Sequence, residues 1–275
     1  DQVAAMSSAQ IAALSTEAFA ALKTAALAAI SSSAAAGITT AQIGTLDTAE
    51  VQALGTDVAQ LGTAAMSSLS TDQVGALTSD QIAALDATDA GALTPDQVAA
   101  MSSAQIAALS TEAFAALSTA ALAAISSSAA AGITTVQIGT LDAAEVQALG
   151  TDVAQLGTAA MASLTSTQLA ALSTAQLNAL DSADVAALSD NAVASLTSTQ
   201  VAALSTDGFS GLSTADLGAL SSAAVAGITT AQIATLDNSE VQALGTDVAQ
   251  LGTAALASLS TGQIGALTTA QMAAL

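Results

Sequence analysis

The feature that most constrains this chain is an eight-residue repeat that runs from one end to the other. Each unit reads Ser/Thr, Ser/Thr, any residue, often Gln, Val/Ile, Ala/Gly, Ala, Leu. The last position is Leu, Ile or Met throughout, and a second apolar column lies three residues before it, broken only by Ala35, Ala90 and Ala130. Two apolar ladders therefore run along the whole sequence, and any fold must bury both of them.

A longer period is superimposed on the octads. One unit in each long cycle is a residue short: Gly55–Leu61 recurs unchanged at 150–156 and at 245–251, a spacing of 95 residues that equals eleven octads and one heptad. Residues 1–69 and 96–164 differ at four positions only, which indicates duplication of a long cassette. We interpret residues 1–275 as a single repeat array with cassettes 1–95, 96–190 and 191–275, the last incomplete. Because the sequence starts and stops inside a repeat, we expect it to be a segment of a longer protein.

The spacing of the two apolar positions favours helices. Residues three apart share one face of a helix but lie on opposite faces of a strand, and Ala, Gln, Leu and Met are good helix formers. The Ser/Thr pair supplies a start signal, and Ser7 with Gln10 reproduces the capping-box pattern. One continuous helix fails, because eight residues overshoot two turns by about 80° and the apolar stripe would wind around the axis. The sequence therefore predicts an all-α solenoid of very short helices, each roughly one and a half turns long.

Two points of architecture stay open. A β-solenoid is the competing fold, since short repeats with Ser, Thr, Asp and Gly at the corners also build such coils. The number of octads per coil is undecided, because the 95-residue period is one residue less than a whole number of coils of either 16 or 24 residues.

The charge balance excludes several classes of partner. The chain has 22 acidic residues against one base, Lys23, and no His. Nucleic-acid binding depends on Lys and Arg that neutralise phosphates, so we expect no nucleic-acid partner, and anionic membrane surfaces are disfavoured for the same reason. Polar residues interrupt every octad, so no run approaches the roughly 20 apolar residues that span a bilayer, and we expect no membrane insertion.

The side chains that carry most enzyme chemistry are missing. The chain has no His and no Cys, and the many Ser and Thr hydroxyls stand at helix-cap positions, where a nucleophile would need a base beside it. The Gly residues follow the octad and not a phosphate-binding spacing. We therefore expect no enzymatic activity, no small-molecule substrate and no required cofactor.

Calcium is the one ion that the acids can be expected to bind. Calcium takes six to eight oxygen ligands, which carboxylates, Thr hydroxyls and corner carbonyls can supply. The candidate residues recur once per cassette and are Asp47, Glu50, Asp142, Glu145, Asp237 and Glu240. Helix capping by the three aspartates explains the same pattern without an ion, so both interpretations stay open.

Runs such as Leu14-Ser15-Thr16, 104–109 and 172–177 carry a resemblance. They resemble the low-complexity octapeptide-repeat tracts of large secreted bacterial surface and adhesin-like fibre proteins. The resemblance implies an extracellular or cell-surface bacterial protein whose repeats act as a fibre or stalk. We expect a structural protein that self-associates into a filament, sheath or fibre; the alternative is a calcium-stiffened stalk of an adhesin, which is a binding module.

Overall fold

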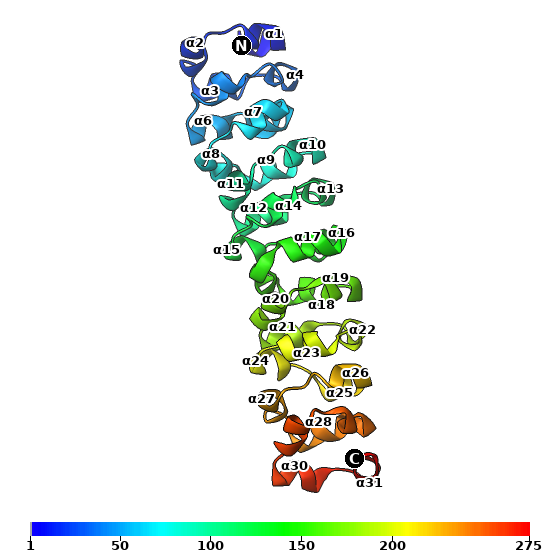
Figure 1. Cartoon of the computed structure of the whole chain (residues 1–275). Helices are drawn as coiled ribbons and strands as arrows, with labels where there is room; N and C mark the ends of the chain where they lie inside the picture. Colours follow the sequence, from blue (N-terminus) through cyan, green and yellow to red (C-terminus); the bar gives the residue numbers. More distant parts are fainter. Residues whose placement is uncertain (1) are drawn as a thin grey trace. The chain divides into compact units, whose positions relative to one another are not determined.

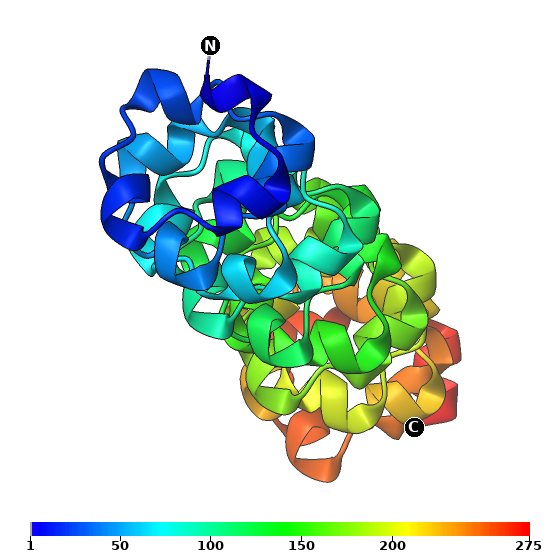
Figure 2. The ribbon, with the colours of Figure 1, turned by 90° about the horizontal axis from the view of Figure 1, so that it is seen from above.

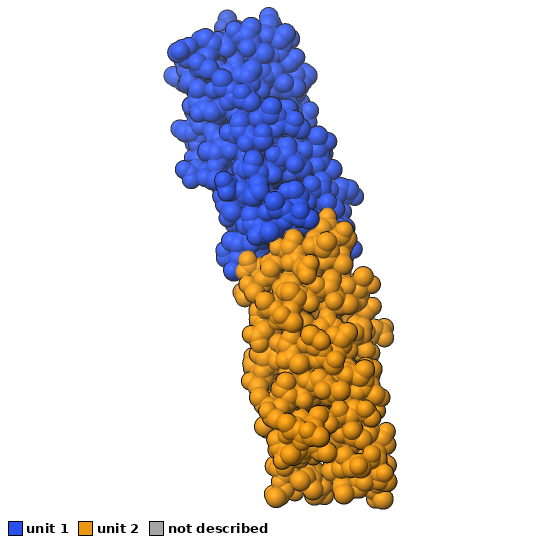
Figure 3. Space-filling model, in the orientation of Figure 1, with its two compact units in different colours: residues 1–140 blue, residues 141–275 orange. Residues whose placement is uncertain are grey.

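The computed structural model describes residues 2–275, and all of their regular structure is helical. No strand occurs in that range, so the β-solenoid alternative is wrong. No described helix exceeds six residues, which confirms the prediction of an all-α solenoid of very short helices, and none has the length and hydropathy of a membrane span. The chain forms two compact units, of which unit 1 ends at Thr140 and unit 2 spans Leu141–Leu275 (Figure 3).

Each unit is a coil with three helices per turn. Within each unit, helices that are three apart in chain order pack against each other. The helices of a unit therefore form three stacked columns, here named sides A, B and C, and the stacking of the successive coils can be followed in Figure 1. Seen from above, the first helices of unit 1 run around a closed circuit (Figure 2).

In unit 1, side A consists of α1 (Ser8–Ala12), α4 (Ser32–Ala35), η2 (Gly55–Gln60), α9 (Ser79–Ala83), α12 (Ser103–Ala108) and α15 (Ser127–Ala130). Side B consists of α2 (Thr16–Ala20), α5 (Thr40–Ile43), α7 (Thr63–Ser67), α10 (Ala87–Gly91), α13 (Thr111–Ala115) and α16 (Thr135–Thr140). Side C consists of η1 (Val3–Ala5), α3 (Thr24–Leu27), α6 (Thr48–Ala53), α8 (Thr71–Ala76), α11 (Pro95–Ala99) and α14 (Thr119–Leu122).

In unit 2, side A consists of η3 (Gly150–Gln155), α20 (Thr174–Ala179), α23 (Ser198–Ala203), α26 (Ser222–Val225), η4 (Gly245–Gln250) and α31 (Thr269–Ala274). Side B consists of α18 (Thr158–Ala162), α21 (Ser182–Ala187), α24 (Thr206–Phe209), α27 (Thr230–Ile233) and α29 (Thr253–Ala257). Side C consists of α17 (Ala143–Ala148), α19 (Ser166–Ala171), α22 (Asp190–Ala194), α25 (Thr214–Ala219), α28 (Asn238–Ala243) and α30 (Thr261–Ala266). The labels η1–η4 denote 3-10 helices, and the others are α-helices.

The sequence signals set the ends of each helix. Ser102 precedes α12 in an extended conformation, and its Oγ accepts a hydrogen bond from the Gln105 backbone N–H at 3.3 Å. Leu109 follows the helix with ψ of 134°, which turns the chain toward the next side. A helix of six residues is not stable alone in water, because nucleation is unfavourable. The helices therefore depend on the coils stacked above and below them.

Both apolar ladders form the core. Ile106 and Leu109 of one octad are buried, and the same two positions are buried along nearly the whole of each unit. Ala35, Ala90 and Ala130, which interrupt the second ladder in the sequence, are also fully buried. Their small side chains occupy core positions and do not mark breaks in the solenoid.

The contacts settle the number of octads per coil. Three octads complete one turn, so a coil has 24 residues, or 23 where a heptad replaces an octad. The 95-residue period is therefore four complete coils. Phe19 and Phe114 accordingly both lie on side B of unit 1, and Gly150 and Gly245 both lie on side A of unit 2.

The seven-residue repeat forms a 3-10 helix that begins with a glycine in the left-handed conformation. Gly150 has φ of 58°, and the described residues have positive φ only there and at the equivalent Gly55 and Gly245. Because a left-handed residue makes a corner without the usual Ser/Thr cap, the chain turns in one residue fewer. Each heptad therefore begins with a different kind of corner. The coil that contains it is one residue shorter, and the following helices keep their sides.

Replacing Gly150 with alanine is expected to destabilise unit 2 by about 1 kcal/mol, the cost of placing a side chain in the left-handed region. Nothing lies within 4 Å of the added β-carbon, so the conformational cost is the whole effect. The matched control is Gly265→Ala, which also meets no neighbour but has no positive φ and is inside a helix. Urea denaturation should show a loss for Gly150→Ala alone; equal midpoints for the two variants would contradict the explanation.

Candidate functional site at the coil corners

The corners between sides carry nearly all of the buried polar groups. Gln105, at the third position of α12, is 3% exposed. Its Oε1 accepts from the Ser102 N–H at 2.8 Å, which completes a capping box. Its Nε2 donates to the carbonyls of Val74 at 2.9 Å and Leu77 at 2.8 Å, which end α8 one coil earlier. One side chain therefore caps its own helix and binds the helix end of the preceding coil.

The same arrangement repeats along both units. Twelve glutamines among residues 2–275 are buried, and each accepts from its N-cap N–H and donates to carbonyls of the preceding coil. They are Gln42, Gln73, Gln81, Gln97, Gln105, Gln137, Gln168, Gln176, Gln200, Gln232, Gln263 and Gln271. The last carbonyls of a helix are incompletely paired within it. The glutamines bind the carbonyl that follows the helix, as at Leu77, and add a second donor to one inside it, as at Val74, which also accepts from the Leu77 N–H. We call this set the glutamine ladder.

The sequence predicted only one of the two functions of these glutamines, which is the capping of their own helix. The capping boxes are confirmed, but the bonds between coils were not predicted. They join residues 26 to 31 apart, for example 28 and 31 from Gln105 to Leu77 and Val74. The carbonyls that each glutamine binds can be predicted only when the number of octads per coil is known. The sequence signal that points to it is the preference for Gln, since Glu would serve the capping box equally well.

The predicted calcium residues form capping boxes as well. Asp47 Oδ1 accepts from the Glu50 N–H at 2.8 Å, and Glu50 Oε2 accepts from the Asp47 N–H at 2.8 Å. The pair Asp142 and Glu145 has the same geometry in unit 2. Asp47 and Asp142 are exposed, and the glutamates are partly exposed. The structure thus brings together the two acids of each pair on side C.

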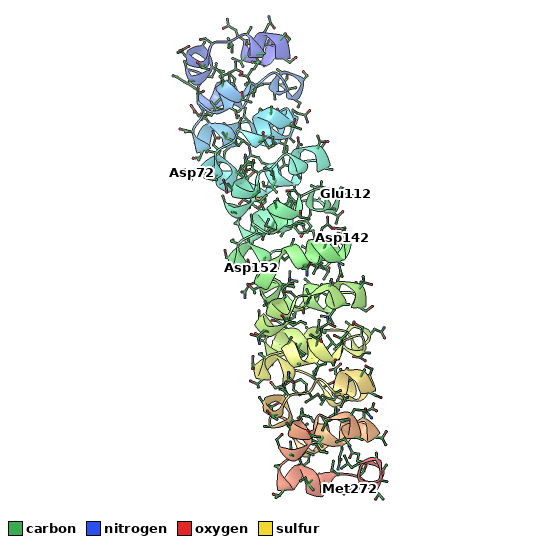
Figure 4. All side chains as sticks on the ribbon, viewed as in Figure 1. Asp72, Glu112, Asp142, Asp152 and Met272 are labelled. Carbon is green, nitrogen blue, oxygen red and sulfur yellow. The ribbon has the colours of Figure 1, made fainter. Side chains whose placement is uncertain are left out.

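The third pair adds an electrostatic detail. The Ser239 hydroxyl donates to Asp237 Oδ1 at 2.7 Å and, together with the Glu240 N–H, lowers the pKa of that carboxyl. Within residues 2–275, no group of three or more acids gathers at metal-binding distance, and no pocket is present. Labelled acids such as Asp72, Glu112 and Asp142 lie on the outside of the helices (Figure 4). Calcium binding at these pairs stays a prediction.

Three corners carry a buried aspartate at the glutamine position. Asp89, Asp184 and Asp216 are 5%, 6% and 7% exposed. Burial raises the pKa of Asp89 and of Asp184, and the neighbouring charges of Asp86 and Asp181 add to this. Asp216 Oδ1 has no hydrogen-bond partner among the described residues. Sequence reasoning did not single out these residues, because an acid at this position looks like any other acid near a helix start.

A comparison with protein families identifies the repeat. The family model described as the ALTTAQ repeat matches residues 51–87, 82–119, 177–214, 209–246 and 246–275, which is more than half of the chain. The chain belongs to the ALTTAQ repeat family. The motif itself occurs at Ala266–Gln271. It comprises the last two residues of one octad, the Thr corner, and the glutamine of the ladder. No curated protein matches this ALTTAQ chain.

Proposed function

We propose that this ALTTAQ segment is a structural element without catalytic activity, which forms part of an extracellular filament, sheath or fibre. The observation that carries the proposal is the glutamine ladder. The buried amides bind one coil to the next, as Gln105 binds Val74 and Leu77. A coil of this kind needs only more of the same sequence to extend, which suits a spacer or fibre.

The state of the hydroxyl groups supports a role without catalysis. Ser102 Oγ accepts from the Gln105 N–H, and Thr94 Oγ1 accepts from the Gln97 N–H in the same way. A nucleophilic hydroxyl needs a general base within hydrogen-bond reach, and the chain has no His. The hydroxyls at these corners serve as helix caps. A small-molecule substrate is therefore not part of the proposal.

The outward residues support self-association. In α12 the exposed residues are Ser103, Ala104 and Ala107, all of them small. Small side chains allow two backbones to approach closely, so copies of the solenoid can pack side by side. With a net charge of −21, association requires screening of charge by salt or cations. The same charge disfavours nucleic acid as a partner. The resemblance to secreted fibre tracts supports a location at the bacterial cell surface.

A second candidate is a calcium-stiffened adhesin stalk. The observation that favours it is the placement of the acidic capping boxes on one side of the coil. In unit 2, the boxes at Asp142 and Asp237 both lie on side C, four coils apart. Exposed carboxylate pairs with neighbouring carbonyls are suitable oxygen ligands for calcium.

Electron microscopy of the dilute full chain, first with calcium and then with chelator, tests both candidates. Uniform filaments in both conditions are expected for the structural polymer. Isolated particles that change dimensions on chelation support the stalk. The triple variant D47N/D142N/D237N keeps the helix caps, since Asn caps as well as Asp, and should abolish only a calcium effect. Isolated particles whose dimensions do not change with calcium, at every protein concentration, would overturn both proposals.

A further inference from the structure

The aspartate corners lack a hydrogen-bond donor that the glutamine corners have. Gln105 Nε2 donates to carbonyls 31 and 28 residues earlier. Counting back the same 31 and 28 residues from Asp89 leads to Val58 and Leu61 at the end of η2. An ionised carboxylate only accepts hydrogen bonds, so at these corners the side chain offers the carbonyls of the preceding coil no donor. Asp216 shows the consequence directly, because its buried Oδ1 has no partner among the described residues.

Asp89 and Asp184 are buried, and each forms a capping box with an exposed aspartate at the N-cap, Asp86 or Asp181. Asp86 Oδ1 accepts from the Asp89 N–H at 2.9 Å, and Asp89 Oδ2 accepts from the Asp86 N–H at 3.1 Å. Asp181 and Asp184 repeat this geometry in unit 2, with distances of 2.9 and 3.1 Å. Both N3 aspartates are more than nine-tenths buried. They differ in this respect from Glu50 and its equivalents, which are partly exposed.

No basic group faces either box. Helix α10 packs against α7, which has no titratable residue, and α13, which contributes Glu112; α21 packs against α18, which has none, and α24, which contributes Asp207. The acids on these helices and on the elements next to them in the chain are Asp57, Asp72, Asp80, Asp86, Asp96 and Glu112 around Asp89, and Asp152, Asp181, Asp190, Asp207 and Asp216 around Asp184. The one base of the chain, Lys23, stands at the N-cap position of α3, on neither of these sets of helices. The surroundings therefore favour the neutral form of both carboxyls.

We propose that Asp89 and Asp184 form hydrogen bonds between coils only when they are protonated. We call such a pH-dependent link a latch. Each takes up one proton from solvent, and its carboxyl O–H then donates to a carbonyl of the preceding coil, directly or through one water molecule, as glutamine does elsewhere. The raised pKa of both groups, caused first by burial, supports this. Because the pKa of each carboxyl is raised in the folded state, the folded state binds these protons more tightly than the unfolded state. The added stability is full below the ordinary aspartate pKa of about 3.9 and is lost as pH rises through the raised pKa.

The double variant D89Q/D184Q tests the latch, with E50Q/E145Q as the matched control. Both remove two charges at the same helix position, one in each unit. Urea denaturation of the full chain is followed at fixed salt between pH 7.5 and about pH 3.5. As the pH falls through the raised pKa of the two carboxyls, they should stabilise the unchanged protein by up to about tenfold in the unfolding equilibrium constant per pH unit and proton site. The control should keep this dependence. D89Q/D184Q should be more stable at pH 7.5 and lose much of the dependence.

Carboxyl-carbon NMR of the unchanged full chain gives a second readout that needs no variant. The side-chain carboxyls of Asp89 and Asp184 should titrate above the ordinary aspartate pKa of about 3.9. Titration of both carboxyls at the ordinary aspartate pKa would overturn the proposal. So would a D89Q/D184Q variant whose pH dependence equals that of the control. The latch concerns coil stability and holds for either candidate function.

Discussion

Replacing Gly132 with alanine should destabilise unit 1 by about 3 kcal/mol, the upper range for inserting a group into a filled interior. The added β-carbon would overlap the Ser103 carbonyl oxygen and lie 2.7 Å from the Ser103 carbonyl carbon. Both are backbone atoms of the preceding coil, so no side chain can rotate to make room. The coils must separate at this point, which also strains the ladder bonds beside it.

The control for this prediction is Gly139→Ala. Gly139 lies in α16 of the same unit, and nothing lies within 4 Å of a β-carbon there. Alanine is a better helix former than glycine by about 1 kcal/mol, so this variant should be neutral or slightly more stable. Thermal and urea denaturation followed by circular dichroism compare the two. A Gly132→Ala variant as stable as Gly139→Ala would show that the coils are less closely stacked than described.

Replacing Gln105 with glutamate should cost about 3 kcal/mol at neutral pH, because a buried carboxylate oxygen would then face two carbonyls without a donor. Glutamate keeps the length of the side chain and the acceptor for the Ser102 N–H. The variant therefore removes only the bonds to the preceding coil. Protonation of the new carboxyl restores a donor, so the loss should shrink as the pH is lowered toward 5.

Gln10→Glu is the control for the change of charge. Gln10 Oε1 accepts from the Ser7 N–H at 2.8 Å, but its side chain is exposed and makes no bond between coils. Glutamate at this position satisfies the capping box and the helix dipole, so stability should change by less than about 0.5 kcal/mol. Equal losses in the two variants would mean that the glutamine ladder contributes only helix capping. Glu50 and Glu145 are tolerated at the same helix position because they are partly exposed.

Local structure could be predicted from the sequence, and long-range pairing could not. The octad specifies where each helix starts, as at Ser102, and which residues are buried, as at Ile106 and Leu109, because caps and apolar spacing act over a few residues. The number of octads per coil depends on contacts about 24 residues away. A period of 95 residues is compatible with two coil lengths, so repeat arithmetic alone could not select one.

Among the site residues, too, only the local roles could be predicted from the sequence. The capping role of Asp47 and Glu50 could be predicted from their spacing, and the structure shows that geometry. The roles of Gln105, Asp89 and Gly132 could not, because each depends on the backbone of the preceding coil. The sequence shows that Gly132 stands where many octads have Ala, but not that a carbonyl fills the space of a β-carbon.

The agreement between the 95-residue cassette and four whole coils has a consequence for how such an array can change in length. Within a unit, adding or deleting one cassette moves the residues that follow it by complete turns, so each returns to the side it had before, as Phe114 does relative to Phe19. Adding a single octad would instead rotate the rest of the unit by one side. Unequal recombination between cassettes can therefore lengthen or shorten the protein while every surface pattern, acidic or apolar, keeps its alignment.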